Sequence, residues 1–367
     1  MRVAIVHYWL VNMRGGEKMI ETLLEMFPEA DVYTHVYDPA AITETIRSKK
    51  IYTSYINKLP FAKKLYQLYM PLMPAALMGF NLQKYDLIIS SEAGPSKGVV
   101  PNPSAYHLCY CHSPMRYLWD IYHEYFRGAT KFVRFFMKRL IPSLRIWDIT
   151  SANLVDRFVT NSNFVAKRIL RIYNRNAHVV YGPVPIKQFL GVERKPEDYY
   201  LMYGQITPYK RVDIAIEACV KSGRKLIVAG KGLAKKYIKQ YKKTDLVSFT
   251  GRVSDEEAAV LFAGAKALLY PGIEDLGFVP IEANAAGCPV IAYGEGGALE
   301  TVKENVTGIF FNEQSPSSLI EALGRFETMD AEGFFKDREL FAEHVQKFSP
   351  EAFKERIEKI VTERKRV

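Results

Sequence analysis

The chain has 367 residues, of which 48% are hydrophobic, 13% aromatic and 25% charged, and its formal net charge at pH 7 is +10. This composition is that of a globular protein and excludes a disordered chain, and the length is enough for two ordinary domains. No run of 18 apolar residues argues for a transmembrane helix. The chain enters a strand pattern at residues 2–6, so we expect no signal peptide. Net positive charge favours anionic partners, but no recognised nucleic-acid-binding motif accompanies it, so we expect no nucleic-acid partner.

The four cysteines are scattered without the spacing of a metal site: Cys109, Cys111, Cys219 and Cys288. We expect them to be free, buried thiols in a reducing cytoplasm. The sequence contains no D-x-D, H-E-x-x-H or C-x-x-C pattern, and six of its histidines show no ligand spacing. We therefore expect a metal-independent chemistry without a cofactor.

Short apolar strands alternate with amphipathic helices from the N-terminus onward. The first series predicts strands at 3–7, 31–35, 86–90, 106–111 and 158–160. Its helices are expected at 17–26, 143–155 and 163–173. Alternation of this kind predicts a parallel sheet covered by helices on both faces.

A second series of the same kind follows. Its strands are expected at 200–203, 225–229, 247–250, 267–270, 290–293 and 308–311. Its helices are expected at 212–221, 234–241, 255–262, 281–286 and 317–326. Two such series predict an α/β protein with two Rossmann-like, doubly wound domains facing each other across a deep cleft. Ligands of open α/β sheets bind beyond the C-terminal ends of the strands, so the loops there are of most interest.

The domain boundaries follow from composition. We expect an N-terminal domain at 1–183, a linker rich in Pro and Gly at 184–197, and a C-terminal domain at 198–348. A final charged helix in 349–367 is expected to pack back toward the N-terminal domain.

Two carboxylates, Glu274 and Glu282, stand out in the second series, with seven residues between them in an otherwise apolar segment. A buried strand precedes them, and the helix that carries Glu282 is expected to stop at Gly287, which supplies a left-handed cap. We expect Gly277 and Pro280 to break the entry to this helix, so that the loop folds back and both acids grip one ligand.

The chemistry of this segment suggests what that ligand is. Ionised carboxylates only accept hydrogen bonds, so the ligand should carry hydroxyls. Backbone N–H groups near Leu276 and Gly277 open a helix, which favours phosphate. Hydroxyls together with phosphate indicate a nucleotide sugar. The alternative is a plain strand–loop–helix unit with two solvated acids.

Three further loops follow predicted strands. Lys210 and Arg211 begin a helix, where cations are electrostatically misplaced. This misfit favours neutralisation of a pyrophosphate over a pair of surface cations. Gly15 and Gly16 also open a helix and let amides approach a phosphate, although a tight turn has the same sequence. His112, at a strand end, would bond a sugar or stabilise charge near its reacting carbon; a packing role is the alternative.

Two segments, 58–78 and 127–145, interleave basic, aromatic and aliphatic residues. Such mixtures suit the interface of an anionic membrane. The alternative is a pair of amphipathic helices that pack on a core and leave their Lys and Arg side chains in water.

The segment from Glu274 to Ala292 reads E-x7-E followed by A-x-A-x-G-x-P-V-I-A. This pattern resembles glycosyltransferase family 4, whose members are retaining enzymes with two Rossmann-like domains in the arrangement called GT-B. The resemblance spans nearly the whole chain. It implies that Glu274 would hold hydroxyls of the donor sugar and Glu282 the nucleotide ribose.

The resemblance also implies roles elsewhere. Lys210 would contact the diphosphate, and His112 would face the sugar, so that these two and Glu274 are the expected catalytic residues. The remaining donor-binding positions are Gly15 and Gly16 beside the diphosphate, Leu276 and Gly277 at the helix start, and Gly251, Arg252 and Val253 beside the base.

One departure from the family concerns the charge at the diphosphate. The family usually has Gly-Arg where this chain has Gly204-Gln205, which removes one cation. Arg211, where the family more often has Gly, is the expected compensation. Lys210, Arg211 and nearby amides would then stabilise the leaving diphosphate in place of a metal ion.

Two runs, from Cys111 to Asp120 and from Pro208 to Asp213, resemble bacterial and archaeal mannosyltransferase-like proteins that build O-antigen and related surface polysaccharides. The resemblance implies GDP-mannose as donor, a polyprenyl diphosphate-linked saccharide as acceptor, and a cytoplasmic protein peripheral to the inner face of the membrane. A UDP- or ADP-sugar donor with a soluble acceptor stays open, as in sucrose-phosphate or glycogen synthases. So does a non-catalytic nucleotide-sugar-binding subunit, which Gln205 makes conceivable.

Overall fold

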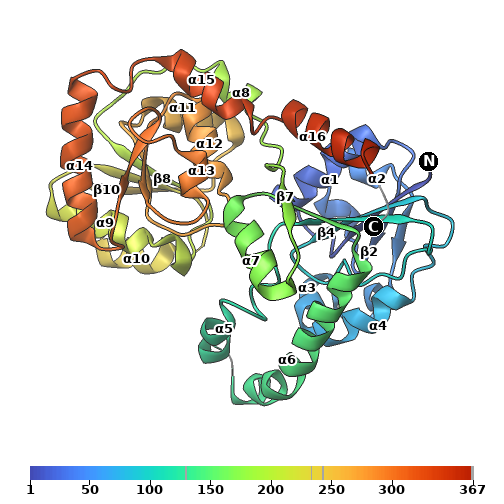
Figure 1. The fold of residues 1–367 in the computed structure, drawn as a ribbon. Helices are drawn as coiled ribbons and strands as arrows, with labels where there is room; N and C mark the ends of the chain where they lie inside the picture. The colour runs from blue at the N-terminus through green and yellow to red at the C-terminus, as the bar shows by residue number, and fades with distance from the viewer. Residues whose placement is uncertain (129, 233, 242–243, 365–367) are drawn as a thin grey trace. The chain divides into compact units, whose positions relative to one another are not determined.

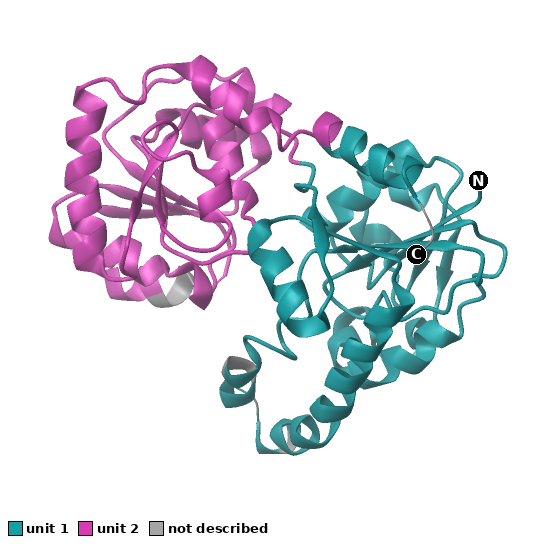
Figure 2. Ribbon diagram, viewed as in Figure 1, with its two compact units in different colours: residues 1–183, 353–367 teal, residues 184–352 magenta. Residues whose placement is uncertain are grey.

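The computed structural model describes residues 1–128, 130–232, 234–241 and 244–364. The chain divides into two compact units (Figure 2). Unit 1 consists of Met1–Pro183 with Phe353–Val367, of which 365–367 lie outside the described residues, and unit 2 consists of Val184–Ala352.

Unit 1 contains a seven-stranded parallel sheet with the order β3-β2-β1-β4-β5-β6-β7. Figure 1 labels β2, β4 and β7 of this sheet. Its strands are β1 Val3–His7, β2 Asp31–Thr34, β3 Ile51–Thr53, β4 Leu87–Glu92, β5 Tyr106–Cys111, β6 Arg157–Thr160 and β7 Ala177–Val179. Strands β1, β4 and β5 are buried along their whole length, as expected for the centre of a sheet covered on both faces.

The helices of unit 1 surround this sheet. They are α1 Gly15–Met26, α2 Glu44–Arg47, α3 Ala62–Leu65, α4 Met73–Met78, α5 Tyr122–Gly128, α6 Lys131–Ser151 and α7 Asn163–Tyr173, with the short 3-10 helices η1 Pro39–Ala41, η2 Tyr55–Lys58, η3 Tyr66–Leu72 and η4 Ala152–Leu154. The C-terminal helix, α16 Pro350–Thr362, inserts Phe353 and Ile357 into the core formed by β1, β4 and α1.

Unit 2 contains a six-stranded parallel sheet with the order β10-β9-β8-β11-β12-β13. Its strands are β8 Tyr200–Tyr203, β9 Leu226–Ala229, β10 Val247–Gly251, β11 Leu268–Tyr270, β12 Val290–Tyr293 and β13 Gly308–Phe311. Its helices are α8 Lys187–Leu190, α9 Val212–Lys221, α10 Ala234–Tyr241, α11 Asp255–Gly264, α12 Phe278–Ala285, α13 Ala298–Thr301, α14 Pro316–Ala331 and α15 Arg338–Gln346, with η5 Pro208–Lys210.

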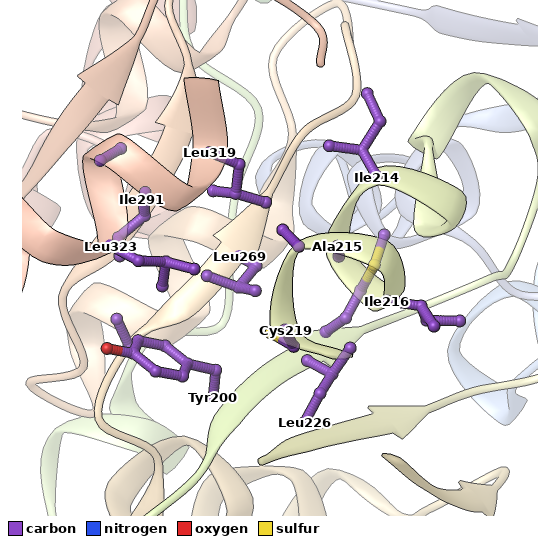
Figure 3. Close-up of a cluster of buried hydrophobic side chains, with 14 of the residues drawn as sticks. Tyr200, Ile214, Ala215, Ile216, Cys219, Leu226, Leu269, Ile291, Leu319 and Leu323 are labelled. Carbon is purple, nitrogen blue, oxygen red and sulfur yellow. The ribbon is translucent and has the colours of Figure 1, made fainter. Parts of the chain in front are cut away.

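One face of the unit 2 sheet is closed by α9 and α14. Figure 3 shows Leu319 and Leu323 of α14 beside Leu269 of β11. Cys219 of α9 lies beside Leu226 of β9 in the same view. The hydroxyl of Tyr200 donates to Glu327 of α14 at 2.8 Å, so the one polar atom of this buried ring is satisfied.

The architecture of two parallel, Rossmann-like sheets confirms the predicted fold class of the two series. The edge strands β3 and β7 were not predicted, because each has only three residues and partly exposed side chains. Helix α6 begins at Lys131 and ends at Ser151, so the helix expected at 143–155 was placed too late, and Pro142 lies within the helix. The cysteines of the sequence are free and buried, as predicted.

The strand order of each unit contains one switch point, where the chain's progress along the sheet reverses. This point lies between β1 and β4 in unit 1 and between β8 and β11 in unit 2. Loops that follow two neighbouring strands diverge there and leave a crevice at the C-terminal ends of the strands, the usual ligand site of such sheets.

Candidate active site

The switch point of unit 2 brings together Lys210, at the end of η5 after β8, and Glu274, in the loop after β11. Lys210 Nζ lies 2.9 Å from Glu274 Oε1, and their side chains are 10% and 19% exposed. The two residues are therefore an ion pair that is mostly withdrawn from water, in the place where the fold binds its ligands.

Two glycines allow this close approach. Lys210 Nζ lies 3.2 Å from the place where a Cβ on Gly204 would stand, and Gly204 has a φ of +115°. A Cβ on Gly272 would stand 2.7 Å from Lys210 Cα, closer than real contacts allow. The two loops thus pack backbone against backbone, and this packing fixes Lys210 beside the loop that carries Glu274.

Helix α12 begins directly after this loop. Gly277 is its N-cap, with a φ of +84° that favours glycine, and a Cβ there would meet the Tyr270 hydroxyl at 2.2 Å. The prediction that Pro280 breaks the helix entry was wrong. Pro280 lies within the first turn, where its missing N–H has no intrahelical acceptor to lose.

The end of α12 agrees with the sequence. Gly287 has a φ of +72°, and its N–H donates to Asn284 O while Cys288 N–H donates to Ala283 O. This pair of bonds is a Schellman motif, so the predicted glycine cap is confirmed. Glu282, one turn before the cap, is partly buried on α12.

Both acids act on Lys210. Burial disfavours the ammonium ion, but the adjacent Glu274 carboxylate outweighs burial, and Glu282 adds to the effect, so that the pKa of Lys210 is raised above its usual value. Lys210 is therefore cationic at neutral pH. Lys210, Glu274 and Glu282 are three of the charged residues for which the sequence predicted ligand contacts, and they lie close enough to interact.

Strand β10 ends at Gly251, which has a φ of +76°, and the loop after it begins with the exposed Arg252. Burial, then Glu282 and Asp255, raise the pKa of Tyr203 to about 12 while Arg252 opposes them, so Arg252 and Glu282 act on the same ring. Val253 is partly buried in this loop, and Gln205, after β8, is exposed.

Arg211 is directed differently from Lys210. It has a φ of +51°, which accounts for a preference for Gly at this position, and it is the N-cap residue of α9. Its guanidinium donates to Asp213 at 3.0 to 3.2 Å. If Arg211 is to supply a diphosphate with the cation that Gln205 lacks, its guanidinium must first release Asp213.

A loop that the sequence analysis missed supports Glu274. Gly297 N–H donates to Glu274 O at 2.8 Å, and a Cβ on Gly297 would stand 2.3 Å from Leu276 Cα. This loop could have been found from the Gly-Glu-Gly-Gly run at 294–297, which follows a predicted strand. Glycines in such a loop indicate that two backbones approach each other closely.

In unit 1, the sheet register places three polar side chains on one face at the switch point. His7 of β1 is the register partner of Ser91 of β4, which pairs with Tyr110 of β5, two residues before His112. Ser91 Oγ lies 2.9 Å from His7 Nδ1 and 3.0 Å from His112 Nε2. Burial, then the neighbouring His7, lower the pKa of His112 to about 3, so His112 is neutral at pH 7.

Gly15 and Gly16 form the first turn of α1, beside this group. A Cβ on Gly16 would stand 2.8 Å from the Tyr8 hydroxyl and 3.4 Å from His7 Cε1. Glu17, the next residue, is 2% exposed, and its Oε1 lies 3.5 Å from His7 Nε2. Gly16 is therefore packed against Tyr8 and His7, and sequence reasoning selected neither of them.

The loop that follows His112 is held by a buried charged cluster. Trp119 Nε1 donates to Asp148 Oδ2 at 2.8 Å, and Asp148 also binds Lys97 and accepts from the Tyr173 hydroxyl. Lys97 and Asp148 are fully buried. The sequence gives little signal for this cluster, because its members are far apart along the chain.

Within the described residues, no three His, Cys, Asp or Glu side chains lie together in a way that would hold a metal ion.

Comparison with solved structures defines the class of fold. Sucrose-phosphate synthase from Thermosynechococcus elongatus is similar, with a TM-score of 0.74 and 18% identity, covering 99% of this chain and 98% of that one. At this identity the likeness concerns the fold, which is that of the GT-B glycosyltransferases.

Family models then match the two halves in succession. "Glycosyltransferase Family 4" matches residues 13–188, and "Glycosyl transferases group 1" matches residues 186–348. The chain belongs to the glycosyltransferases of family 4. The family model of residues 186–348 contains the Lys210–Glu274 pair, and that of residues 13–188 contains His112.

Curated relatives are less complete matches. Human alpha-1,3/1,6-mannosyltransferase ALG2 is 30% identical over 272 residues, which are 62% of this chain and 63% of that protein. The GDP-mannose-dependent alpha-(1-6)-phosphatidylinositol monomannoside mannosyltransferase of Mycobacterium tuberculosis is 39% identical over 87 residues, 22% of this chain and 23% of that protein. The matched regions thus span less than two thirds of these relatives.

Proposed function

We propose that this protein is a retaining hexosyltransferase that moves mannose from GDP-mannose to a polyprenyl diphosphate-linked saccharide in the synthesis of a surface polysaccharide. The observation that carries the proposal is the Lys210–Glu274 pair at the switch point of unit 2, 2.9 Å apart and largely buried. The choice of mannose is supported by two mannosyltransferases among the relatives.

The donor site is proposed in unit 2. Lys210 binds the diphosphate, the first-turn amides of α12 after Leu276 and Gly277 face its oxygens, and Glu274 accepts from hydroxyls of the mannose. Glu282 accepts from the ribose. The loop of Gly251, Arg252 and Val253 flanks the base. The Lys210–Glu274 pair is then rearranged by the donor, because the phosphate competes for the ammonium group.

The reaction breaks the bond between the anomeric carbon and the diphosphate and forms a bond from that carbon to an acceptor hydroxyl oxygen on the same face. The acceptor's proton passes to the departing phosphate oxygen, so GDP and the glycoside are the products. Lys210 and the α12 amides stabilise the charge that develops on the diphosphate. We propose that they do so without a metal ion. For His112 we propose the hydrogen bond to a hydroxyl of the transferred sugar that the resemblance to the family implies.

The acceptor's lipid is proposed to bring the protein to an anionic membrane, at the cytoplasmic face. No helix in the described residues is long and apolar enough to span a bilayer. Segment 58–78, made of η3 and flanking short helices, exposes Phe61 and Leu68 beside exposed lysines. Segment 127–145, whose residue 129 lies outside the described residues, includes the N-terminal part of α6, which Figure 1 labels. Phe135 and Phe136 of this helix are exposed.

The helices that carry these two segments pack on one hydrophobic cluster of unit 1. Trp147 of α6 packs against the hydrophobic cluster that contains Leu77 of α4, so α4 and α6 cover the same part of the unit. Interleaved cations and exposed aromatic rings are the chemistry of an interfacial surface. Vesicle sedimentation tests this: Phe135→Ser with Phe136→Ser should weaken binding to anionic vesicles, whereas Val260→Ser, on an exposed site of unit 2, should not.

The direct test is transfer by the purified chain. It is incubated with radiolabelled GDP-mannose, UDP-glucose or ADP-glucose, each with a polyprenyl diphosphate-linked saccharide or a soluble sugar phosphate. Label from GDP-mannose in the lipid fraction is the expected result. Transfer only to the soluble sugar phosphate would show that the acceptor is soluble and not lipid-linked. Binding of a donor without transfer or hydrolysis would indicate a non-catalytic subunit.

A further inference from the structure

The residues around His112 form a continuous series of polar contacts across the sheet of unit 1. Glu17 Oε1 lies 3.5 Å from His7 Nε2, His7 Nδ1 lies 2.9 Å from Ser91 Oγ, and Ser91 Oγ lies 3.0 Å from His112 Nε2. Glu17, His7 and Ser91 are almost completely buried, so water does not interrupt the series.

Glu17, at the buried end of this series, decides which atom of each pair donates the proton. Although burial favours the neutral acid, its contact with His7 and hydrogen bonds from the backbone N–H groups of Glu17 and Arg14 lower the pKa of Glu17, which is therefore a carboxylate at neutral pH. Its Oε2 accepts from the Arg14 N–H at 2.9 Å, which holds the group in place. A carboxylate only accepts, so Oε1 orients a proton on His7 Nε2 toward itself.

The donor and acceptor roles of the remaining atoms in the series then follow one from another. A neutral His7 that carries its proton on Nε2 has a lone pair on Nδ1, which accepts the Ser91 hydroxyl proton. The Ser91 oxygen in turn accepts from His112 Nε2–H. His112 is thereby left with an unprotonated Nδ1. Tyr110, whose ring lies 5.0 Å from that of His112, holds the imidazole from the side.

We propose that Glu17, His7 and Ser91 are positioning residues that hold His112 in its Nε2–H tautomer, so that Nδ1 accepts a hydrogen bond from a hydroxyl of the transferred sugar. The sugar contact rests on the function proposed above, whereas the tautomer does not. The same arrangement gives Gly16 a second role, because a side chain there would press on Tyr8 and on His7 Cε1.

The variant Glu17→Gln tests the direction of the series. The Arg14 N–H requires an acceptor, so the amide oxygen takes the place of Oε2 and the amide NH₂ faces His7 Nε2. His7 must then carry its proton on Nδ1 and donate to Ser91, whose hydroxyl donates to His112 Nε2. The proton of His112 moves to Nδ1, so the tautomer is inverted.

Ser91→Ala and Ser90→Ala form a matched pair of variants. Ser91→Ala removes the link between the two histidines. Ser90 Oγ makes an equivalent contact of 2.8 Å with His107 Nε2, on the opposite face of the same strand and outside the series. Ser90→Ala therefore controls for the loss of a buried serine–histidine bond in β4.

The measurement is long-range ¹H–¹⁵N NMR of His112 in the full chain, assigned with His112→Gln. We expect Nε2–H with unprotonated Nδ1 in the wild type and in Ser90→Ala, the reverse in Glu17→Gln, and a mixture in Ser91→Ala. Wild-type His112 protonated on Nδ1, or an unchanged tautomer in Glu17→Gln, would overturn the proposal.

Kinetics provide a second readout. Glu17→Gln and Ser91→Ala should lower kcat by about tenfold to a hundredfold, the usual cost of one lost buried hydrogen bond. The affinity for GDP, which lacks the sugar, should not change, and Ser90→Ala should keep the wild-type kcat. If His112→Gln transfers mannose as the wild type does, the proposed role of His112 fails, and the NMR result still decides whether the series sets its tautomer.

Discussion

Lys210 and Glu274 allow stability and function to be separated by a double-mutant cycle. Breaking a fully buried ion pair by removing one partner costs about 3–5 kcal/mol, and an exposed pair contributes about 0–1 kcal/mol. With side chains 10% and 19% exposed, this pair lies between these limits. We expect Lys210→Met and Glu274→Gln each to destabilise unit 2 by about 2 kcal/mol.

The double variant should behave differently from either single one. With both charges removed, no uncompensated charge stays buried, so most of the stability should return. Activity should not return, because Lys210 and Glu274 act on the donor separately. Each single variant should lose about 10²–10³-fold in kcat, as for loss of one stabilising donor in a transition state.

Thermal unfolding and steady-state transfer measure the two effects. For a unit the size of 184–352, about 2 kcal/mol corresponds to a fall in Tm of about 4–8 °C. The double variant should recover most of this fall and no more than a small part of kcat. Recovery of kcat together with Tm would refute the reasoning, because it would make the pair structural only.

Three further predictions follow from individual positions. Burial lowers the pKa of both His35 and His107 to about 4. Because the pKa of an unfolded histidine is about 6.5, the unfolded chain binds more protons than the folded one between these two values. The free energy of unfolding of unit 1 should therefore fall by about 1.4 kcal/mol per histidine when the pH is lowered from 7.5 to 5.5. Urea unfolding followed by hydrogen exchange checks this, and His107→Gln with an unchanged pH slope would contradict it. Gly277→Ala should destabilise unit 2 by about 1–3 kcal/mol through its positive φ and the Tyr270 hydroxyl, whereas Gly324→Ala in α14, with open space around it, should be neutral or stabilising in the same melts. Chelation of divalent cations by EDTA should leave mannose transfer unchanged, and a loss that Mg²⁺ or Mn²⁺ restores would show that a metal ion shares the task assigned to Lys210 and the α12 amides.

The sequence predicts the elements of this fold well where strands are long and buried. β1, β5, β8 and β12 were predicted with the bounds that the structure has, because their apolar runs are flanked by turn residues. The start of α12 was misplaced, since Pro280 tolerates a first helical turn but reads as a breaker in sequence.

The candidate site was predictable to the extent that it is local in sequence. Glu274, Gly277 and Lys210 follow strands directly, so strand order alone brings them together. The series of His7, Ser91 and Glu17 was not predictable, because it depends on which strands are neighbours and on their register. The Arg211–Asp213 pair likewise depends on a backbone conformation that sequence does not reveal at a non-glycine residue.

The central claim is that Lys210 binds the diphosphate of a nucleotide sugar in unit 2. Isothermal titration calorimetry of GDP and GMP, which differ by one phosphate, tests it most directly in the wild type and in Lys210→Met. We predict that the wild type binds GDP about 10–100-fold more tightly than GMP, as for a hydrogen bond to a charged group, and that Lys210→Met loses this preference. An equal preference in both proteins would contradict the account.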